Sequence, residues 1–228
     1  MNIFITATDT DAGKTYVSKG IVTELLKRGK KTAYFKPFQS GIVENILSDA
    51  DTVSTAKNTT LLTTKNSYIT KTPCTPSISA KIDNINIDIE KVKKDYKELE
   101  KNHDIVITEG SGGLFVPVND KLLMSDIIKE LHLPCIVVAR PNLGTINHTL
   151  LTLCALKSLN IDILGIVISN YPKNSKDPCI TTAPKLIEEF SKKLDEHFNR
   201  NICGTKILDI INHNENDFEK IVDEILKN

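Results

Sequence analysis

The chain has 228 residues, of which 40% are hydrophobic and 25% are charged, values typical of a soluble globular protein with a sizeable core. Its 29 Lys and Arg residues balance 29 Asp and Glu residues, so no general electrostatic attraction favours nucleic acid or an acidic membrane as a partner. The five cysteines are scattered and never form a C-x-x-C pair, which argues against a disulfide framework or a zinc site. We find no signal-peptide pattern and no apolar run approaching the roughly 20 residues that span a bilayer, so we expect a cytoplasmic protein.

Apolar, β-branched runs alternate with amphipathic stretches along the chain. The runs predict strands over residues 2–6, 31–35, 105–109, 135–139 and 163–169. Helical stripes cover residues 17–26, 89–99, 146–156 and 215–227, whereas residues 37–82 form the least regular part. Strands that are apolar on both faces and alternate with helices predict one α/β domain over residues 1–228, with a doubly wound, mostly parallel sheet and helices on both faces. In such a fold, an irregular insert beyond the carboxyl ends of the strands is a place where ligands bind.

A phosphate-binding loop is predicted directly after the first strand, where residues 7–15 read ATDTDAGKT and a helix follows. Backbone N–H groups at such a helix start can surround phosphates. Lys14 would supply a cation to the terminal phosphates and Thr15 a hydroxyl to Mg²⁺. The match is imperfect because the G-x-x-x-x-G-K-[ST] pattern requires glycine where this chain has Thr8. The alternative is an ordinary helix whose N-terminus is capped by one of the polar residues 9–11.

Two further groups of polar residues follow predicted strands. Lys36 ends the second strand and precedes Pro37, although a single lysine is more often a solvated surface residue. Further on, Asp49 and Asp51 are both candidates for a metal ligand, and either could instead cap the following helix.

The third group, residues 105–113, reads IVITEGSGG, an apolar strand that ends in Glu109 and three glycines. A carboxylate at the end of a buried strand is typical of a Walker-B-like metal site, and the glycines let the backbone approach a nucleotide. The alternative is a glutamate that caps a loop beside an ordinary glycine turn. A buried carboxylate is costly unless it is used, which favours the metal site.

These motifs together resemble those of the dethiobiotin synthetases, a family among the P-loop proteins with a mostly parallel sheet. The resemblance covers residues 1–172 and rests on five segments in order: Thr-Asp-Thr-x-x-Gly-Lys-Thr at 8–15, Lys-Pro-x-x-Ser-Gly at 36–41, Ser-Asp-Ala at 48–50, Glu-Gly-x-Gly-Gly at 109–113, and Gly-x-Ile-Asn-His at 144–148. Ala7 stands where the family usually has glycine. The family pattern favours Asp49 over Asp51.

The resemblance implies a role for each matching residue. Lys36 and Lys14 would be the catalytic cations, and Thr15, Asp49 and Glu109 would hold Mg²⁺. The nucleotide would bind to Asp11, Ala12, Gly13, Lys14, Thr15, Tyr16, Glu109 and Asn170, the last of these reading the adenine edge. The substrate carbamate would bind to Thr10, Lys36 and Ser40, and the substrate carboxylate to Gly144, Thr145, Ile146 and Asn147, partly across a homodimer interface.

The implied reaction is the ATP-dependent carboxylation and ring closure of 7,8-diaminononanoate with CO₂, through a carbamate and a carbamic–phosphoric anhydride. Two other functions are open. A partitioning-type ATPase usually carries a second lysine early in its phosphate loop, which residues 7–12 lack. A cobyrinate-type amide synthetase would normally carry a glutaminase domain, for which 228 residues leave little room. Beyond residue 172 the chain departs from the family, because residues 203–208 lack the proline of the family's Gly-x-Ile-Pro segment. We therefore predict weaker selectivity for adenine.

Overall fold

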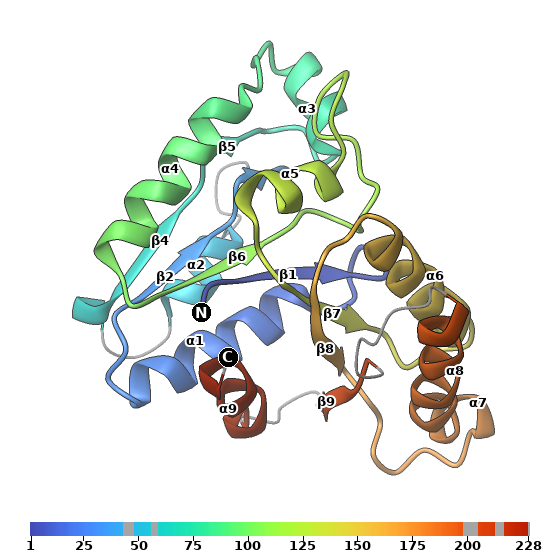
Figure 1. The fold of residues 1–228 in the computed structure, drawn as a ribbon. Helices are drawn as coiled ribbons and strands as arrows, with labels where there is room; N and C mark the ends of the chain where they lie inside the picture. Colours follow the sequence, from blue (N-terminus) through green and yellow to red (C-terminus); the bar gives the residue numbers. More distant parts are fainter. Residues whose placement is uncertain (43–47, 56–58, 198–204, 213–216, 228) are drawn as a thin grey trace.

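The computed structural model describes residues 1–42, 48–55, 59–197, 205–212 and 217–227 (Figure 1). Seven parallel strands form the main sheet in the order β4-β2-β6-β1-β7-β8-β9, with β1 at its centre. Their bounds are β1 (Ile3–Ala7), β2 (Thr32–Phe35), β4 (Leu62–Lys65), β6 (Ile105–Glu109), β7 (Cys135–Ala139), β8 (Ile163–Ile168) and β9 (Ile207–Ile210). Because all seven run the same way, the carboxyl ends of β1, β2 and β6 meet at one edge.

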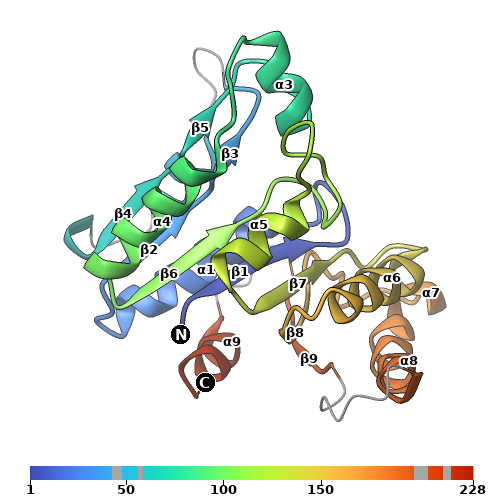
Figure 2. The ribbon, with the colours of Figure 1, turned by 45° about the horizontal axis from the view of Figure 1, so that its top comes forward.

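Helices cover both faces of this sheet, and each face has its own buried apolar cluster (Figures 1 and 2). One face packs against α1 (Lys14–Lys27), α2 (Asp49–Ser54) and α9 (Glu219–Lys227). The other face packs against α3 (Pro76–Ile82), α4 (Ile89–Asn102), α5 (Met124–Leu131), α6 (Thr145–Ser158) and α8 (Ala183–His197). Short helices η1 (Thr59–Leu61) and α7 (Pro178–Thr181) complete the chain. The predicted doubly wound α/β fold is confirmed.

The five predicted strands are present to within one residue at each end, but the two edge strands were not predicted. β4, with the sequence LTTK, is partly exposed along its length, and β9 buries only Leu208 fully. An edge strand lacks the continuous apolar run of a central parallel strand, so its sequence resembles a loop. Residues 37–82, expected to be the least regular part, contain only short elements, among them α2, β4 and α3.

The insert around β3 (Phe38–Gln39) and β5 (Tyr68–Ile69) extends beyond the ends of β2 and β4 as a small parallel sheet. The rings of Phe38 and Tyr68 stack in an almost parallel arrangement, with their centroids 6.1 Å apart. The carbonyl of Pro37 accepts hydrogen bonds from the N–H groups of Ser67 and Tyr68. These contacts hold together the two segments of the insert that follow β2 and β4.

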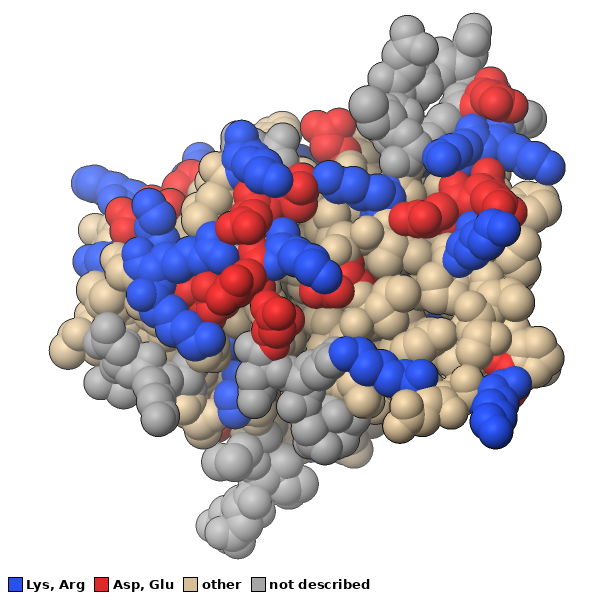
Figure 3. Space-filling model, turned by 90° about the horizontal axis from the view of Figure 1, so that it is seen from below, with Lys and Arg blue, Asp and Glu red and all other residues tan. Residues whose placement is uncertain are grey.

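The surface carries charges of both signs. In the view from below, positive and negative side chains interleave over much of the face (Figure 3). Within the described ranges, no helix is long and apolar enough to cross a membrane.

Candidate active site

The phosphate loop connects β1 to α1 through backbone conformations that its sequence permits. Gly13 has φ 95°, and a Cβ atom there would lie 2.4 Å from the Ser169 hydroxyl oxygen, so this position requires glycine. Helix α1 begins at Lys14, and among the described residues no side chain caps it. The alternative of a conventionally capped helix is therefore wrong. The N–H groups of the first turn of α1 are available to an anion.

The carboxylate of Asp9, which was a candidate for that cap, bonds elsewhere. It accepts hydrogen bonds from the N–H of Thr10 at 2.7 Å and from the Arg140 guanidinium at 2.7 Å. This ion pair joins the phosphate loop to the residue that follows β7.

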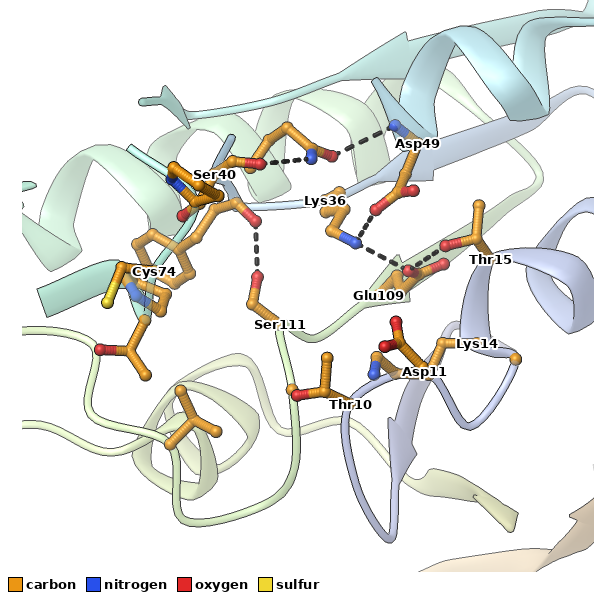
Figure 4. A pocket seen from close by; sticks show the side chains of 18 of the residues that line it. Thr10, Asp11, Lys14, Thr15, Lys36, Ser40, Asp49, Cys74, Glu109 and Ser111 are labelled. Atoms are coloured by element: carbon orange, nitrogen blue, oxygen red, sulfur yellow. Dashed lines mark hydrogen bonds and ion pairs between the residues drawn. The ribbon is translucent and has the colours of Figure 1, made fainter. Parts of the chain in front are cut away.

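The loop opens into a cavity of about 800 Å³ at the carboxyl-end edge of the sheet (Figure 4). Four segments form its walls: the phosphate loop, the segment from the end of β2 through β3, the start of α2, and the chain after β6. Residues 73–76, which lead into α3 and include its first residue, close it from a further side. Of the predicted site residues, those lining this cavity are Thr10, Asp11, Gly13, Lys14, Thr15, Tyr16, Lys36, Ser40, Asp49 and Glu109.

Lys36 lies between two carboxylates inside this cavity (Figure 4). Its ammonium is 2.9 Å from Glu109 Oε1 and also forms an ion pair with Asp49. The lysine is only 7% exposed, so the interpretation as a solvated surface lysine is wrong. Lys36 comes directly after β2, and Glu109 is the last residue of the neighbouring strand β6, which brings them together.

Glu109 is completely buried, and both of its oxygens accept hydrogen bonds. Oε1 accepts from the Thr15 hydroxyl at 3.0 Å, and Oε2 accepts from Ser18 at 2.7 Å and from Tyr34 at 2.9 Å. Burial by itself would raise the pKa of Glu109, but Lys36, the Ser18 hydroxyl and Lys14 together lower it below its ordinary value. The carboxylate is therefore ionised, and the alternative of a loop cap is wrong.

The two lysines of the cavity differ electrostatically. Burial lowers the pKa of Lys14, against the opposing attraction of Glu109. Burial also acts on Lys36, but Glu109 and Asp49 outweigh it and raise the pKa of this lysine. Lys36 is thus held as a cation by the two carboxylates.

The two aspartates at the start of α2 have different environments. Ser48 caps the helix, and the Asp51 carboxylate completes a capping box by accepting from the Ser48 N–H at 2.9 Å. Asp49 instead points toward Lys36 (Figure 4). Asp51 therefore serves the helix terminus, and only Asp49 faces the cavity.

The oxygens of Thr15, Asp49 and Glu109 could together hold a metal ion. Hydroxyl and carboxylate oxygens are the ligands that Mg²⁺ prefers, and Mg²⁺ usually takes few of them from the protein. In the described part of the chain, no group of three or more His, Cys, Asp or Glu residues could hold a metal. The donor set fits a Mg²⁺ that completes its coordination with water and phosphate, and it does not suggest a resident metal held by protein ligands alone.

Two predicted segments lie outside this cavity. Asn170 borders a neighbouring cavity of about 390 Å³ together with Ala12, Tyr16 and Arg140. The residues 144–146 border another, of about 260 Å³, beside α7, whereas Asn147 is exposed and lines none of the three cavities. Helix α6 begins after Gly144, which has φ 94°, and no side chain of the described residues caps this helix either.

Two residues that contact Glu109, Ser18 and Tyr34, were not predicted. Their positions nevertheless carried a signal. Ser18 lies one helical turn after Thr15, and Tyr34 shares a face of β2 with Lys36 because alternate residues of a strand point the same way. Gln39 was also missed, and its side-chain oxygen accepts from the Asp49 N–H at 3.2 Å.

Comparison with known proteins identifies the family. A family model described as an AAA domain matches residues 1–215. The protein named ATP-dependent dethiobiotin synthetase BioD of Methanococcus vannielii is 42% identical over 188 residues, covering 82% of this chain and 88% of its own length. Proteins of the same name from Methanocaldococcus jannaschii and Bacillus subtilis are 37% and 35% identical, over 96% and 91% of this chain and 99% and 85% of their own lengths.

Solved structures show the fold at much lower identity. The cell division ATPase MinD of Pyrococcus furiosus superposes with a TM-score of 0.54 at 15% identity, covering 99% of this chain and 98% of its own. A plasmid partition protein of Borrelia burgdorferi gives 0.56 at 16% identity, with 100% and 99% coverage. The fold is shared with these two proteins, whereas the sequence relatives determine the family: the chain belongs to the ATP-dependent dethiobiotin synthetases.

Proposed function

We propose that this chain, as a single synthetase domain, converts 7,8-diaminononanoate, CO₂ and ATP into dethiobiotin, ADP and phosphate. The observation that carries the proposal is the meeting of Lys14, Thr15, Lys36, Asp49 and Glu109 around one cavity at the end of the phosphate loop. Each of these residues matches a motif of the family. The cavity of about 800 Å³ has room for the triphosphate of a nucleotide beside a small substrate.

The proposed reaction has three steps. One amine of the substrate attacks CO₂, loses a proton and becomes a carbamate. A carbamate oxygen then attacks the γ-phosphorus of ATP, and ADP leaves. The second amine attacks the carbonyl carbon of the resulting anhydride, and the ureido ring closes as phosphate leaves. Every intermediate and leaving group in this sequence is anionic, so a cavity with two buried lysines suits it.

The residues of the cavity would act mainly by positioning and charge. Lys14 would contact the terminal phosphates from the start of α1, and Lys36 would leave its two carboxylates to contact the carbamate and the transferring phosphoryl group. Thr10 and Ser40, on opposite walls, would bond the carbamate. No covalent nucleophile from the protein is needed.

Mg²⁺ bound by Thr15, Asp49 and Glu109 would neutralise charge on the β- and γ-phosphates. The two carboxylates already face one cation, the Lys36 ammonium, and so form a site built for positive charge. With Mg²⁺ held by these residues, Lys36 would be free to contact the substrate.

The start of α6 would bind the substrate carboxylate from a second copy of the chain. Residues 144–146 border a cavity separate from the main one, which favours a contribution across a homodimer interface. Leu143 and Leu151, beside and on α6, are 84% and 60% exposed and would be buried there. Sedimentation of the wild type and of Leu151→Glu tests this assembly, because a charge at a dimer contact should yield monomers.

The reaction itself is tested by phosphate release with Mg-ATP and bicarbonate, with and without 7,8-diaminononanoate, alongside capture of labelled carbon in acid-stable product. We expect release that depends on the diamine and equals product formation. Glu109→Gln should abolish both, whereas Glu100→Gln, which alters a glutamate bonded to Tyr96 and Asn2, should not. Diamine-independent hydrolysis without fixed carbon would overturn the proposal and favour a partner-regulated ATPase.

A further inference from the structure

The two oxygens of the Glu109 carboxylate face different surroundings. Oε1 meets the polar groups of the cavity, the Thr15 hydroxyl at 3.0 Å and the Lys36 ammonium at 2.9 Å. Oε2 meets two hydroxyls behind it, Ser18 at 2.7 Å and Tyr34 at 2.9 Å. One oxygen is thus presented to the site, and the other is held from the protein interior.

The two hydroxyls come from separate elements and are rigidly placed. Ser18 lies on α1 and Tyr34 on β2, and neither residue has any exposed surface. Together with Glu109 on β6, they join three elements at one carboxylate. A planar carboxylate whose rear oxygen accepts two hydrogen bonds from fixed directions has little freedom to rotate.

Neutral donors suit the placing of this carboxylate because a hydroxyl does not neutralise the negative charge of Glu109. Both hydroxyls are uncharged and donate their protons to Oε2. The positive charge of Lys36 contacts the other oxygen, Oε1, on the side of the cavity. Asp49 contrasts with this arrangement, since its side chain is 30% exposed and lies at the start of a short helix.

We propose that Ser18 and Tyr34 are positioning residues that hold Glu109 Oε2 and thereby fix Oε1 toward the metal and nucleotide. This inference rests on the proposed role of Glu109 in Mg²⁺ binding. Removing either hydroxyl leaves a buried carboxylate oxygen with one donor fewer, which lets the group rotate or be drawn further onto Lys36. Outer partners of this kind typically change metal affinity about 10–100-fold when they are removed.

The test uses Tyr34→Phe and Ser18→Ala, each of which deletes one hydroxyl oxygen. Mn²⁺ serves as the probe for Mg²⁺, and the signal of free Mn²⁺ in electron paramagnetic resonance reports binding in the presence of ADP. Each variant should raise the dissociation constant of Mn²⁺ at least about tenfold. In steady-state assays, the Mg²⁺ requirement should rise while the KM for the diamine stays the same. Because the two hydroxyls come from different elements, one variant gives a result even if the other fails to fold.

Matched controls are available elsewhere in the chain. Tyr96 is a buried tyrosine whose hydroxyl donates to Glu100 at 3.0 Å, and Ser191 is a buried serine that bonds two backbone carbonyls. Tyr96→Phe and Ser191→Ala should leave Mn²⁺ binding unchanged. The proposal is overturned if Tyr34→Phe and Ser18→Ala bind Mn²⁺ like the wild type, or if the controls weaken binding equally.

Glu109→Gln separates this proposal from the function on which it rests. If this variant loses Mn²⁺ while the two hydroxyl variants retain it, only the positioning role fails. If Glu109→Gln keeps full Mn²⁺ affinity, the proposed metal site itself fails, whatever the hydroxyl variants do.

Discussion

At the scale of single residues, Lys36 has the largest expected effect because it neutralises two carboxylates in a buried place. Lys36→Met keeps much of the side-chain volume but leaves Glu109 and Asp49 facing each other without their cation. Breaking a buried ion pair by removing one partner costs about 3–5 kcal/mol. We expect the free energy of unfolding, measured by urea denaturation without metal, to fall by about 3 kcal/mol, and synthetase activity to fall at least about 100-fold.

Lys65 provides the matched control for this change. It also bonds two carboxylates, Asp95 at 3.0 Å and Glu98 at 2.8 Å, but its side chain is 29% exposed against 8% for Lys36. Without Lys65, Asp95 keeps its bonds to Lys91 and Ser67, and Glu98 is exposed to solvent. Lys65→Met should therefore cost about 0–1 kcal/mol, as for solvent-exposed pairs, and keep its activity. Millimolar Mg²⁺ should restore part of the lost stability in Lys36→Met alone. Equal losses in the two variants would contradict the special position of Lys36.

At the scale of elements, the packing of α9 on α1 predicts that replacing a helix glycine by alanine destabilises the protein, although this change usually stabilises a helix. Gly20 lies inside α1, where Gly→Ala normally stabilises a helix by about 1 kcal/mol. Here an added Cβ would lie 2.1 Å from the ring of Phe218, which is 3% exposed and packs on Tyr16 with the ring centroids 6.0 Å apart. Overpacking of this kind costs about 1–3 kcal/mol, so Gly20→Ala should lower the melting temperature.

A double-mutant cycle separates packing from helix propensity in this contact. With Phe218→Ala in the background, the obstacle to the added methyl group is gone, and Gly20→Ala should become neutral or stabilising. Thermal unfolding of the wild type, the two single variants and the double variant measures the coupling. An increase in stability for Gly20→Ala in the wild-type background would show that α9 does not press on this face of α1.

Central elements were predictable from the sequence, and peripheral ones were not. The strands β1, β6 and β7 are buried at every position, and their continuous apolar runs clearly predicted buried strands. β4 and β9 lie at the sheet edges and α2 is a six-residue helix, and none of these has enough buried surface to leave a clear pattern. In the site, motif residues such as Lys36 and Glu109 could be predicted from their places at strand ends. Ser18 and Tyr34 were missed although their spacing from Thr15 and Lys36 carried a signal, because a serine in a helix or a tyrosine in a buried strand is ordinary until its partner is known.

At the scale of the whole molecule, the proposed nucleotide site would join the phosphate loop to segments far along the chain. The phosphate loop follows β1, while the cavity beside it, of about 390 Å³, is completed by Arg140 after β7 and by Asn170 after β8. Asn170 has φ 58°, a conformation that asparagine tolerates better than most residues, and it is exposed at the mouth of this cavity. Among the described residues that line this cavity, Ser169 is the one buried polar side chain, so the base would meet few buried polar groups there.

This geometry leads to the prediction of weak selectivity for adenine. Residues 203 and 204 lie outside the described residues, and residues 205–208 lead into β9 without the proline of the family pattern. If the Asn170 amide is the main group that reads the base, one neutral hydrogen bond of about 1 kcal/mol gives about fivefold discrimination. We expect kcat/KM for ATP to exceed that for GTP and CTP by no more than about tenfold, and Asn170→Ala to bring the three values close together. Asn142→Ala, which changes another exposed asparagine that lines the same cavity, should leave the ratios unchanged. A preference for ATP of more than about 100-fold in the wild type would mean that other groups read the base, because one such hydrogen bond cannot supply the nearly 3 kcal/mol which that ratio requires.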